Sequence, residues 1–301
     1  DHREEQVLYG RGLSVDPDLK KGGVSAMKKA CLDPYSPFHK TGHTSKGDQR
    51  KWKVENIWYK ADYMGYEGLA EVLVSHLLKK SSLKYPFVNY EAVKIDYNGS
   101  SMNACFSEDF REKGQVLIPL EKLFRQYTGE SLAVRLAGFE ETKDRIVYLV
   151  DELEKITKIK DFGAYLTAML EVDAFFLNED RHTNNIALVY DEQTGIYSLS
   201  PFFDQGLCLL ADTRQDYPLE MTLEQCLKKI EAKPFHSDFD IQLEAAEELY
   251  GIQQHFSFAI QDVKEELKNA AELYPEEICS RVEQILRMQM RKYAYLMQSR
   301  K

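Results

Sequence analysis

Short runs in which hydrophobic and polar residues alternate dominate the first third of the chain and predict β-strands there. The runs KWKV and IWYKAD, within residues 51–62, flank a tight turn and predict a β-hairpin. Two further runs, at 87–96 and 102–107, lie on either side of an Asn98-Gly99 turn. Between the two pairs, residues 67–83 carry apolar side chains at helical spacing and are rich in Ala, Leu and Glu, which favours a helix.

Beyond Phe110 the hydrophobic spacing becomes mostly helical. Apolar residues cover much of the circumference of a helix over 161–178, which indicates a helix buried at the centre of a lobe. Two short strands are expected at 186–190 and 196–200, on either side of the turn DEQTG. Further helices are expected at about 219–231, 240–250, 257–273 and 276–298.

This order of elements predicts an α+β fold with two lobes. The β-rich N-lobe would span residues 1–108 and the helical C-lobe residues 109–301. Residues 1–50 are rich in Gly, Pro, Lys and Asp and show little periodicity, so loops and short helices are expected there. No internal repeat or low-complexity tract interrupts the pattern.

Composition and charge narrow the class of protein. The 301 residues are 44% hydrophobic, ample for real cores, and carry a formal net charge of −10 with a pI near 5.3. That charge argues against direct binding to nucleic acid or to anionic membranes. No apolar stretch approaches the ~18 residues of a spanning helix, and residues 1–20 are charged rather than signal-like. Five scattered cysteines without a CxxC pair fit a reducing compartment, so a soluble cytoplasmic protein is expected, with secretion into a host left open.

Residues 176–206, FLNEDRHTNNIALVYDEQTGIYSLSPFFDQG, contain a pattern that indicates a chemical reaction. Within it, Asp180 is followed five residues later by Asn185 and, after two apolar runs, by Asp204. Phosphoryl transfer needs such a set: a carboxylate to orient a hydroxyl, then an amide and a second carboxylate to hold Mg²⁺ against ATP phosphates. A single loop Asp would more often cap a turn, but the spacing to Asn185 and Asp204 favours catalysis. Asn184 is the neighbouring alternative for the amide ligand.

The order of parts along the chain is that of protein kinases: a hairpin with a lysine, a helix with a glutamate, more strands, and a helical half with Asp, Asn and Asp. The motif DRHTNN, with His after the Asp, and the later SPFFDQG in place of Asp-Phe-Gly resemble the HipA family of bacterial serine/threonine kinases. The similarity is scattered over about residues 44–210 and densest at 178–206. It implies a two-lobed, kinase-like HipA fold with a phosphate loop at 44–51, a catalytic loop at 178–185 and a metal-binding segment at 200–206.

The resemblance implies a role for each residue of the catalytic loop. Asp180 aligns with the catalytic aspartate that accepts or orients the proton of the acceptor hydroxyl. Asn185 resembles the amide metal ligand, and Asp204 the carboxylate that bridges Mg²⁺ to the phosphates. His182 has two interpretations, a structural histidine that steadies the loop or a residue close to the nucleotide. Arg181 would either offset the two carboxylates or face solvent.

Two charged residues upstream resemble the family's phosphate-gripping pair. Lys60, in IWYKAD, is similar to the strand lysine that holds the α- and β-phosphates, although a lysine at a strand end is usually only exposed. Glu71 is the expected partner that aims Lys60 from the following helix, and Glu67, one turn earlier, is the rival. Both carboxylates share one helix face, so the sequence leaves the choice open.

The basic segment KGDQRKWK overlaps the expected phosphate loop. It contains no GxGxxG; instead Gly47, Gln49 and Lys51 match the HipA-family Gly-x-Gln-x-Lys loop, whose backbone N–H groups and lysine would meet phosphate oxygens. Thr44 and Ser45 precede this motif, where the family can carry an inhibitory autophosphorylation site. A phosphate there would add roughly −1.5 to −2 charge beside the ATP phosphates and oppose closure of the loop.

The connection CFSEDF, residues 105–110, is expected to form the hinge between the lobes. By resemblance, the main chain of Glu108 and Phe110 would hydrogen-bond adenine. An ordinary acidic loop is the alternative interpretation, because main-chain recognition leaves little mark in a sequence.

These observations predict an ATP- and Mg²⁺-dependent serine/threonine protein kinase of HipA-like type that autophosphorylates and acts on an unidentified protein substrate. The alternatives are a small-molecule or lipid kinase on the same fold, and a nucleotide-binding pseudokinase or toxin–antitoxin binding module. The proposed loop begins at Thr44, so the chain resembles the compact members that lack an additional N-terminal subdomain. Capture by a DNA-binding antitoxin through that subdomain is therefore not implied, although an antitoxin or regulatory partner stays open.

Overall fold

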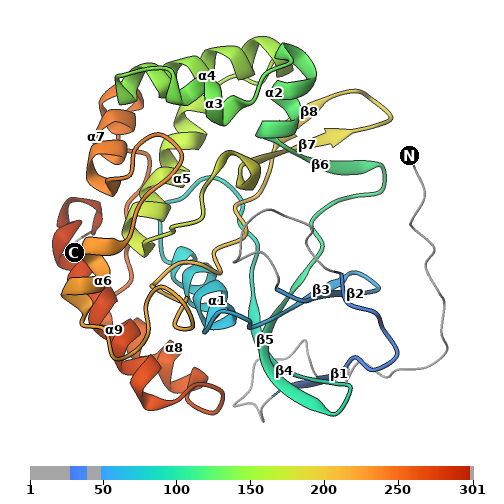
Figure 1. Ribbon diagram of the computed structural model, residues 1–301, viewed down its shortest axis with the longest axis vertical. Coiled ribbons are helices and arrows are strands. Elements are labelled where there is room, and N and C mark those ends of the chain that lie inside the picture. The colour runs from blue at the N-terminus through green and yellow to red at the C-terminus, as the bar shows by residue number, and fades with distance from the viewer. Residues whose placement is uncertain (1–27, 39–48, 299–301) are drawn as a thin grey trace.

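The computed structural model describes residues 28–38 and 49–298, and it has the mixed α+β architecture with two lobes that the sequence predicts. Figure 1 shows a curled five-stranded sheet in one lobe and most of the helices in the other, with a three-stranded sheet beside the helices. Three of the predicted site residues, Thr44, Ser45 and Gly47, lie outside the described residues.

The larger sheet has the strand order β1-β4-β5-β3-β2. Both predicted hairpins are present, because β2 pairs antiparallel with β3 and β4 pairs antiparallel with β5. At the β4–β5 turn, Asn98 and Gly99 have φ angles of 48° and 76°, the left-handed conformation that this residue pair favours. The strands are β1 (Lys29–Cys31), β2 (Lys51–Val54), β3 (Ile57–Ala61), β4 (Glu91–Tyr97) and β5 (Ser100–Glu108).

Strand β1 differs from the loops and short helices expected for residues 1–50. It pairs in parallel with β4, with Ala30 opposite Ile95. Its three residues are too few to show a period, so the partner strand rather than local propensity defines it. The strand predicted to begin at Phe87 begins instead at Glu91, because the chain before it bonds elsewhere: the backbone N–H of Val88 donates to the carbonyl of Phe202 over 2.8 Å.

Helix α1 (Glu67–Leu78) lies between the large sheet and the helical lobe. Every residue in it except His76 is buried, and it contacts both β5 and helix α8 (Ile260–Ala270). The helix is shorter than the predicted 67–83, because the backbone N–H of Ser82 donates to His255 over 2.9 Å and draws the chain away. Helix α1 is therefore held by packing against both the large sheet and the helical lobe, and so are its side chains that face the space between the lobes.

The predicted central helix is confirmed as α5 (Phe162–Phe176), in which every residue except Ala164 is buried. The helix predicted at 219–231 is shorter, because Thr222 forms a capping box with Gln225 and sets its start. The remaining helices are α2 (Leu120–Thr128), α3 (Leu132–Ala137), α4 (Thr142–Thr157), α6 (Leu223–Lys229), α7 (Phe239–Tyr250) and α9 (Glu276–Lys292), with 3₁₀ turns η2 (Thr183–Asn185) and η3 (Ala294–Leu296). None of the helices in the described part of the chain is both long and apolar enough to cross a membrane.

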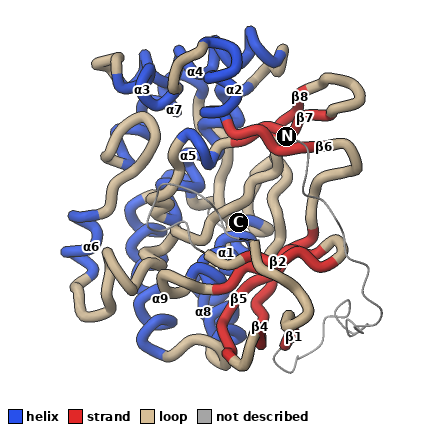
Figure 2. The backbone as a smooth tube through the Cα atoms, turned by 45° about the vertical axis from the view of Figure 1, so that its right-hand side comes forward, coloured by secondary structure: helices blue, strands red, loops and turns tan. Residues whose placement is uncertain are grey.

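The smaller sheet has the order β6-β7-β8, and Figure 2 shows it separate from the larger one. Its strands are β6 (Gln115–Pro119), β7 (Ala187–Asp191) and β8 (Tyr197–Leu199). Strand β7 follows η2 directly, and α5 ends only a few residues before η2. Residues 178–185 are thus fixed at one end by a buried helix and at the other by a paired strand.

Candidate active site

Lys60 lies at the centre of a buried charged cluster. Strand β3 places it opposite Cys105 of β5, and its side chain is only 8% exposed. Its Nζ is 3.2 Å from Oε2 of Glu71 and 3.3 Å from Oδ1 of Asp204. The same Nζ lies 5.2 Å from the centre of the Tyr90 ring, a cation–π distance. One ammonium group therefore joins three segments that are far apart in the sequence.

The two candidate glutamates of α1 have different tasks. Glu71 makes the ion pair with Lys60. Glu67 instead accepts hydrogen bonds from the backbone N–H groups of Tyr63, Met64 and Gly65, at 3.0, 2.9 and 2.7 Å. Glu67 thus ties down the turn before the helix, and the choice that the sequence left open falls on Glu71 for the ion pair.

The carboxylates around Lys60 keep it charged. Burial alone would lower the pKa of Lys60, but Glu71 and Asp204 outweigh it, and the pKa lies well above its ordinary value. Burial, together with the neighbouring Glu71, raises the pKa of Tyr90 as well. The cluster therefore presents a cation and a neutral phenol at neutral pH.

The segment that carries Asp204 passes close to α1. Asp204 has a φ angle of 66°, which is unusual for a residue other than glycine. Two residues later, a Cβ on Gly206 would lie 3.4 Å from Cβ of Glu67 and 3.6 Å from Oε1 of Glu71, which are ordinary van der Waals distances. The segment that carries Asp204 therefore packs directly against α1.

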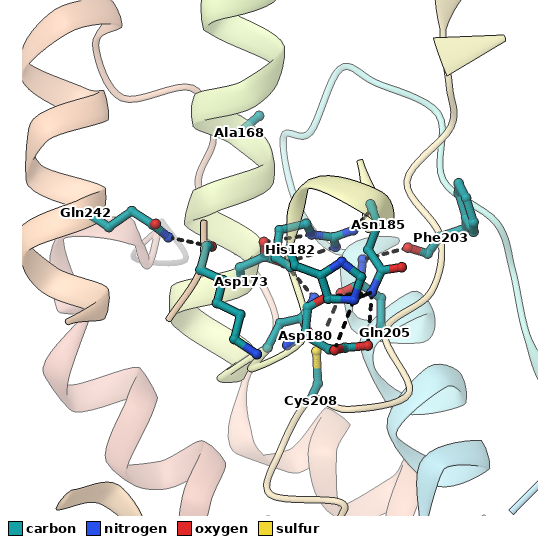
Figure 3. Close-up of polar contacts among 12 residues, drawn as sticks. Ala168, Asp173, Asp180, His182, Asn185, Phe203, Gln205, Cys208 and Gln242 are labelled. Atoms are coloured by element: carbon teal, nitrogen blue, oxygen red, sulfur yellow. Dashed lines mark hydrogen bonds and ion pairs between the residues drawn. The ribbon is translucent and has the colours of Figure 1, made fainter. Parts of the chain in front are cut away.

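Asp180, His182 and Asn185 come together on the loop after α5, as Figure 3 shows. Nδ2 of Asn185 donates to the carbonyl oxygen of Asp180 over 2.6 Å and to its Oδ2 over 2.9 Å. Nε2 of His182 is 3.1 Å from Nδ2 of Asn185 and 3.5 Å from Oδ1 of Asp180. The amide nitrogen of Asn185 faces Asp180, so its oxygen is directed to the other side. Asn184, the alternative ligand, is exposed.

Arg181 does not face solvent, which was one of the two interpretations of the sequence. It is buried, with a side chain 3% exposed, and it pairs with Asp173 of α5. Its Nε and Nη2 lie 2.9 and 3.1 Å from the two carboxylate oxygens, and its Nη1 donates to the carbonyl of Asn185 over 2.9 Å. Asp173 was missed by sequence reasoning. Its signal is an acidic residue inside a helix that is otherwise almost entirely apolar, MLEVDAFF.

Backbone contacts join the catalytic loop to the Asp204 segment. The N–H of Leu209 donates to the carbonyl of Phe176 over 2.8 Å, and the N–H of Glu179 donates to Leu207 over 3.5 Å. Glu179 also forms a set with Asp212 and Asp216, whose carboxylate oxygens lie within 4.8 Å of one another beside the loop. The loop and the Lys60 cluster are therefore parts of one framework.

The described part of the expected phosphate loop reaches the start of the hairpin. Lys51 lies in β2 directly opposite Lys60 in the strand register. Gln49 precedes the strand, and its Nε2 is buried without a hydrogen-bond partner among the described residues. The structure thus places the end of this segment next to the strand that carries Lys60.

The expected hinge leaves the large sheet beside an apolar cluster. Glu108 is the last residue of β5, and Phe110 packs on Phe203 with ring centres 5.6 Å apart. Asp109, between them, accepts from Nε1 of Trp58 at 3.0 Å and from Arg111 at 2.9 Å. The cluster that Phe110 and Phe203 join contains Val72, Val88, Tyr90 and Cys105. The cluster therefore reaches from Phe110 of the expected hinge to Tyr90 and Cys105, which lie beside Lys60.

No protein-family model matches the chain. No curated protein matches it either. Among solved structures, the Helicobacter pylori proinflammatory kinase CtkA is similar with a TM-score of 0.55 and 16% identity, over 81% of this chain and 90% of CtkA. A chain of the Shewanella oneidensis MR-1 complex of HipA, HipB and operator DNA is similar with a TM-score of 0.41 and 13% identity, over 91% of this chain and 67% of that chain. The likeness to CtkA confirms the kinase-like fold that the sequence resemblance implies.

Proposed function

We propose that the protein is an ATP- and Mg²⁺-dependent serine/threonine protein kinase of HipA-like type. The observation that carries the proposal is the position of Lys60, whose Nζ contacts both Glu71 and Asp204. A lysine buried between two carboxylates is charged and preoriented, and one of those carboxylates lies on the segment joined to the catalytic loop. This arrangement suits the binding of a polyphosphate and the transfer of its terminal group.

The N-lobe residues would bind the nucleotide. Lys60 would contact the α- and β-phosphates while Glu71 holds it in place. Lys51 and Gln49, at the end of the phosphate loop, support contacts to the outer phosphates, because Lys51 lies in register with Lys60. The apolar cluster around Phe110 supports an adenine site at the hinge.

The C-lobe residues would carry out the transfer. Asp180 would accept the proton of the acceptor hydroxyl while the hydroxyl oxygen bonds to the γ-phosphorus and ADP leaves. Asn185 and Asp204 offer amide and carboxylate oxygens, the donors that Mg²⁺ prefers. Bound Mg²⁺ would neutralise charge on the phosphates. His182, within 3.1 Å of Asn185, supports the position of that amide.

A panel of acceptors tests the reaction class, and variants of two neighbouring asparagines test the metal site. Purified wild-type protein is incubated with γ-labelled ATP, with and without Mg²⁺, alone and with panels of peptides, small molecules and lipids. Label on serine or threonine of the protein or a peptide supports the proposal, and label only on a small molecule or lipid supports the alternative acceptor class. Asn185→Ala should lose Mg²⁺-dependent labelling, whereas the exposed Asn184→Ala should keep it. ATP binding without any turnover in the wild type would indicate a pseudokinase.

Two further expectations, autophosphorylation and a protein partner, concern parts of the molecule outside this site. Inhibitory autophosphorylation at Thr44 or Ser45 is checked by mapping phosphate on the protein after incubation with ATP and Mg²⁺. An antitoxin or regulatory partner remains an expectation from the sequence resemblance.

A further inference from the structure

One buried carboxylate, Asp173, contacts two residues of the catalytic loop, one at its start and one in its middle. Asp173 accepts from Arg181 at 2.9 and 3.1 Å, and Nδ2 of Asn178 donates to its Oδ1 over 3.0 Å. These two partners then reach the reacting residues. Arg181 donates to the carbonyl of Asn185 over 2.9 Å, and Oδ1 of Asn178 accepts from the backbone N–H of Asp180 over 3.0 Å.

The network is isolated from solvent. The side chains of Arg181 and Asp173 are 3% and 1% exposed, and Asn178 is also buried. A forked pair held by two parallel hydrogen bonds is more restricted in geometry than a surface ion pair.

We propose that Asp173, Arg181 and Asn178 are positioning residues that set the separation between Asp180 and Asn185 and thereby the requirement for Mg²⁺. The inference rests on the proposed kinase function and deepens it. Asn178 fixes the backbone at Asp180, and Arg181 fixes the backbone at Asn185. The positions of Asp180 and Asn185 therefore both depend on the same carboxylate, that of Asp173 on a rigid helix. Substitution of residues that hydrogen-bond to a metal ligand and orient it commonly lowers the affinity for the metal.

The alternative is that the pair only stabilises the fold. Arg181→Lys separates the two ideas, because lysine keeps the charge but cannot reach both oxygens of Asp173 and the carbonyl of Asn185 together. The matched control is Arg145→Lys. Arg145 also donates to two carbonyls of the helical lobe, those of Phe139 at 2.9 Å and Phe235 at 2.8 Å, and it does not contact the loop.

The experiment measures kcat, KM for ATP, the Mg²⁺ concentration for half-maximal rate, and the thermal midpoint for wild type and both variants. We expect Arg181→Lys to lower kcat by about 10- to 100-fold and to raise the Mg²⁺ midpoint by roughly 10-fold, with little change in KM for ATP. Arg145→Lys should lower only the thermal midpoint. An unchanged Mg²⁺ midpoint in Arg181→Lys, or an equal change in Arg145→Lys, would overturn the inference.

A second variant covers the case in which Arg181→Lys does not fold. Asn178→Ser leaves the Asp173–Arg181 pair intact and shortens the side chain that accepts from Asp180. It should lower kcat and raise the Mg²⁺ midpoint while the protein remains folded, and wild-type values for both would overturn the inference. A wild-type protein that transfers no phosphate to any acceptor would instead overturn the kinase proposal on which the inference rests.

Discussion

Two buried ion pairs lie in the candidate site, and they are built differently. Lys60 presents a single ammonium to two carboxylates, Glu71 and Asp204, at 3.2 and 3.3 Å. Arg181 presents a fork to one carboxylate, Asp173, and donates to both of its oxygens. If Lys60 exchanged Asp204 for a phosphate, Glu71 would still provide it with a counter-charge. Arg181 pairs with the single carboxylate of Asp173, so this pair is suited to holding the loop in place rather than to binding a ligand.

The largest effect should come from breaking the arginine pair. Asp173→Ala leaves the Arg181 guanidinium buried without its counter-charge, which typically costs about 3–5 kcal/mol of stability. The free energy of unfolding, measured by urea denaturation, should fall by that amount. Asp151→Ala, at an exposed position of the neighbouring helix α4, is the control and should change it little. If the free energy of unfolding of Asp173→Ala fell no further than that of the control, Asp173 would not support the loop.

A smaller effect should appear as a pH dependence of the free energy of unfolding at helix α1. His76, on the helix that carries Glu71, lies 2.7 Å from Glu266 and 3.2 Å from Glu91. Burial alone would lower the pKa of His76, but hydrogen bonds to Glu266 and Glu91 outweigh it and raise the pKa to about 9. The same contact lowers the pKa of Glu91 to about 2 against the opposing effect of burial.

The sign of the His76 effect follows from its raised pKa. Its stabilisation is complete below the unfolded value of about 6.5 and is lost as the pH rises through about 9. His76 should account for a loss of about 2 kcal/mol in the free energy of unfolding between pH 6 and pH 10, reduced from the full shift because the site is partly solvated, and urea denaturation of the wild type and His76→Gln measures that difference. His76→Gln should flatten the profile. A profile that is the same in the variant and the wild type would assign the loss to other groups.

The smallest stability effect is expected at Glu71. In Glu71→Gln, Lys60 keeps Asp204 as a counter-charge, so the free energy of unfolding should fall by only about 1–2 kcal/mol. Nucleotide binding should weaken, because Lys60 is no longer held from the helix. Thermal denaturation and ATP titration measure both quantities on one sample. A loss as large as that of Asp173→Ala would remove the distinction between the two pairs.

The sequence predicted features that depend on local patterns. The Asn98-Gly99 turn, the central helix α5 and the proximity of Asp180 to Asn185 follow from residue type and short spacing. The parallel pairing of β1 with β4 does not, because a three-residue strand depends on a distant partner. The choice between Glu67 and Glu71 was also beyond it.

The partner of Arg181 shows why the rest of the site was harder to predict. Asp173 and Arg181 are eight residues apart, but a sharp change of chain direction separates them, at Leu177 with a φ angle of 57°. Whether Arg181 points outward or back onto α5 depends on that turn, which no residue pattern marks. The acidic residue inside an apolar helix was the available signal, and its partner required the structure.

The central claim is that Asp180 takes the proton of the acceptor during phosphoryl transfer. The most direct measurement is the rate of γ-phosphoryl transfer at saturating ATP and Mg²⁺ in wild type and Asp180→Ala, with ATP affinity determined on the same samples. We expect a rate about 10²- to 10⁴-fold lower in the variant, with unchanged ATP affinity. Transfer at the wild-type rate by Asp180→Ala would contradict it.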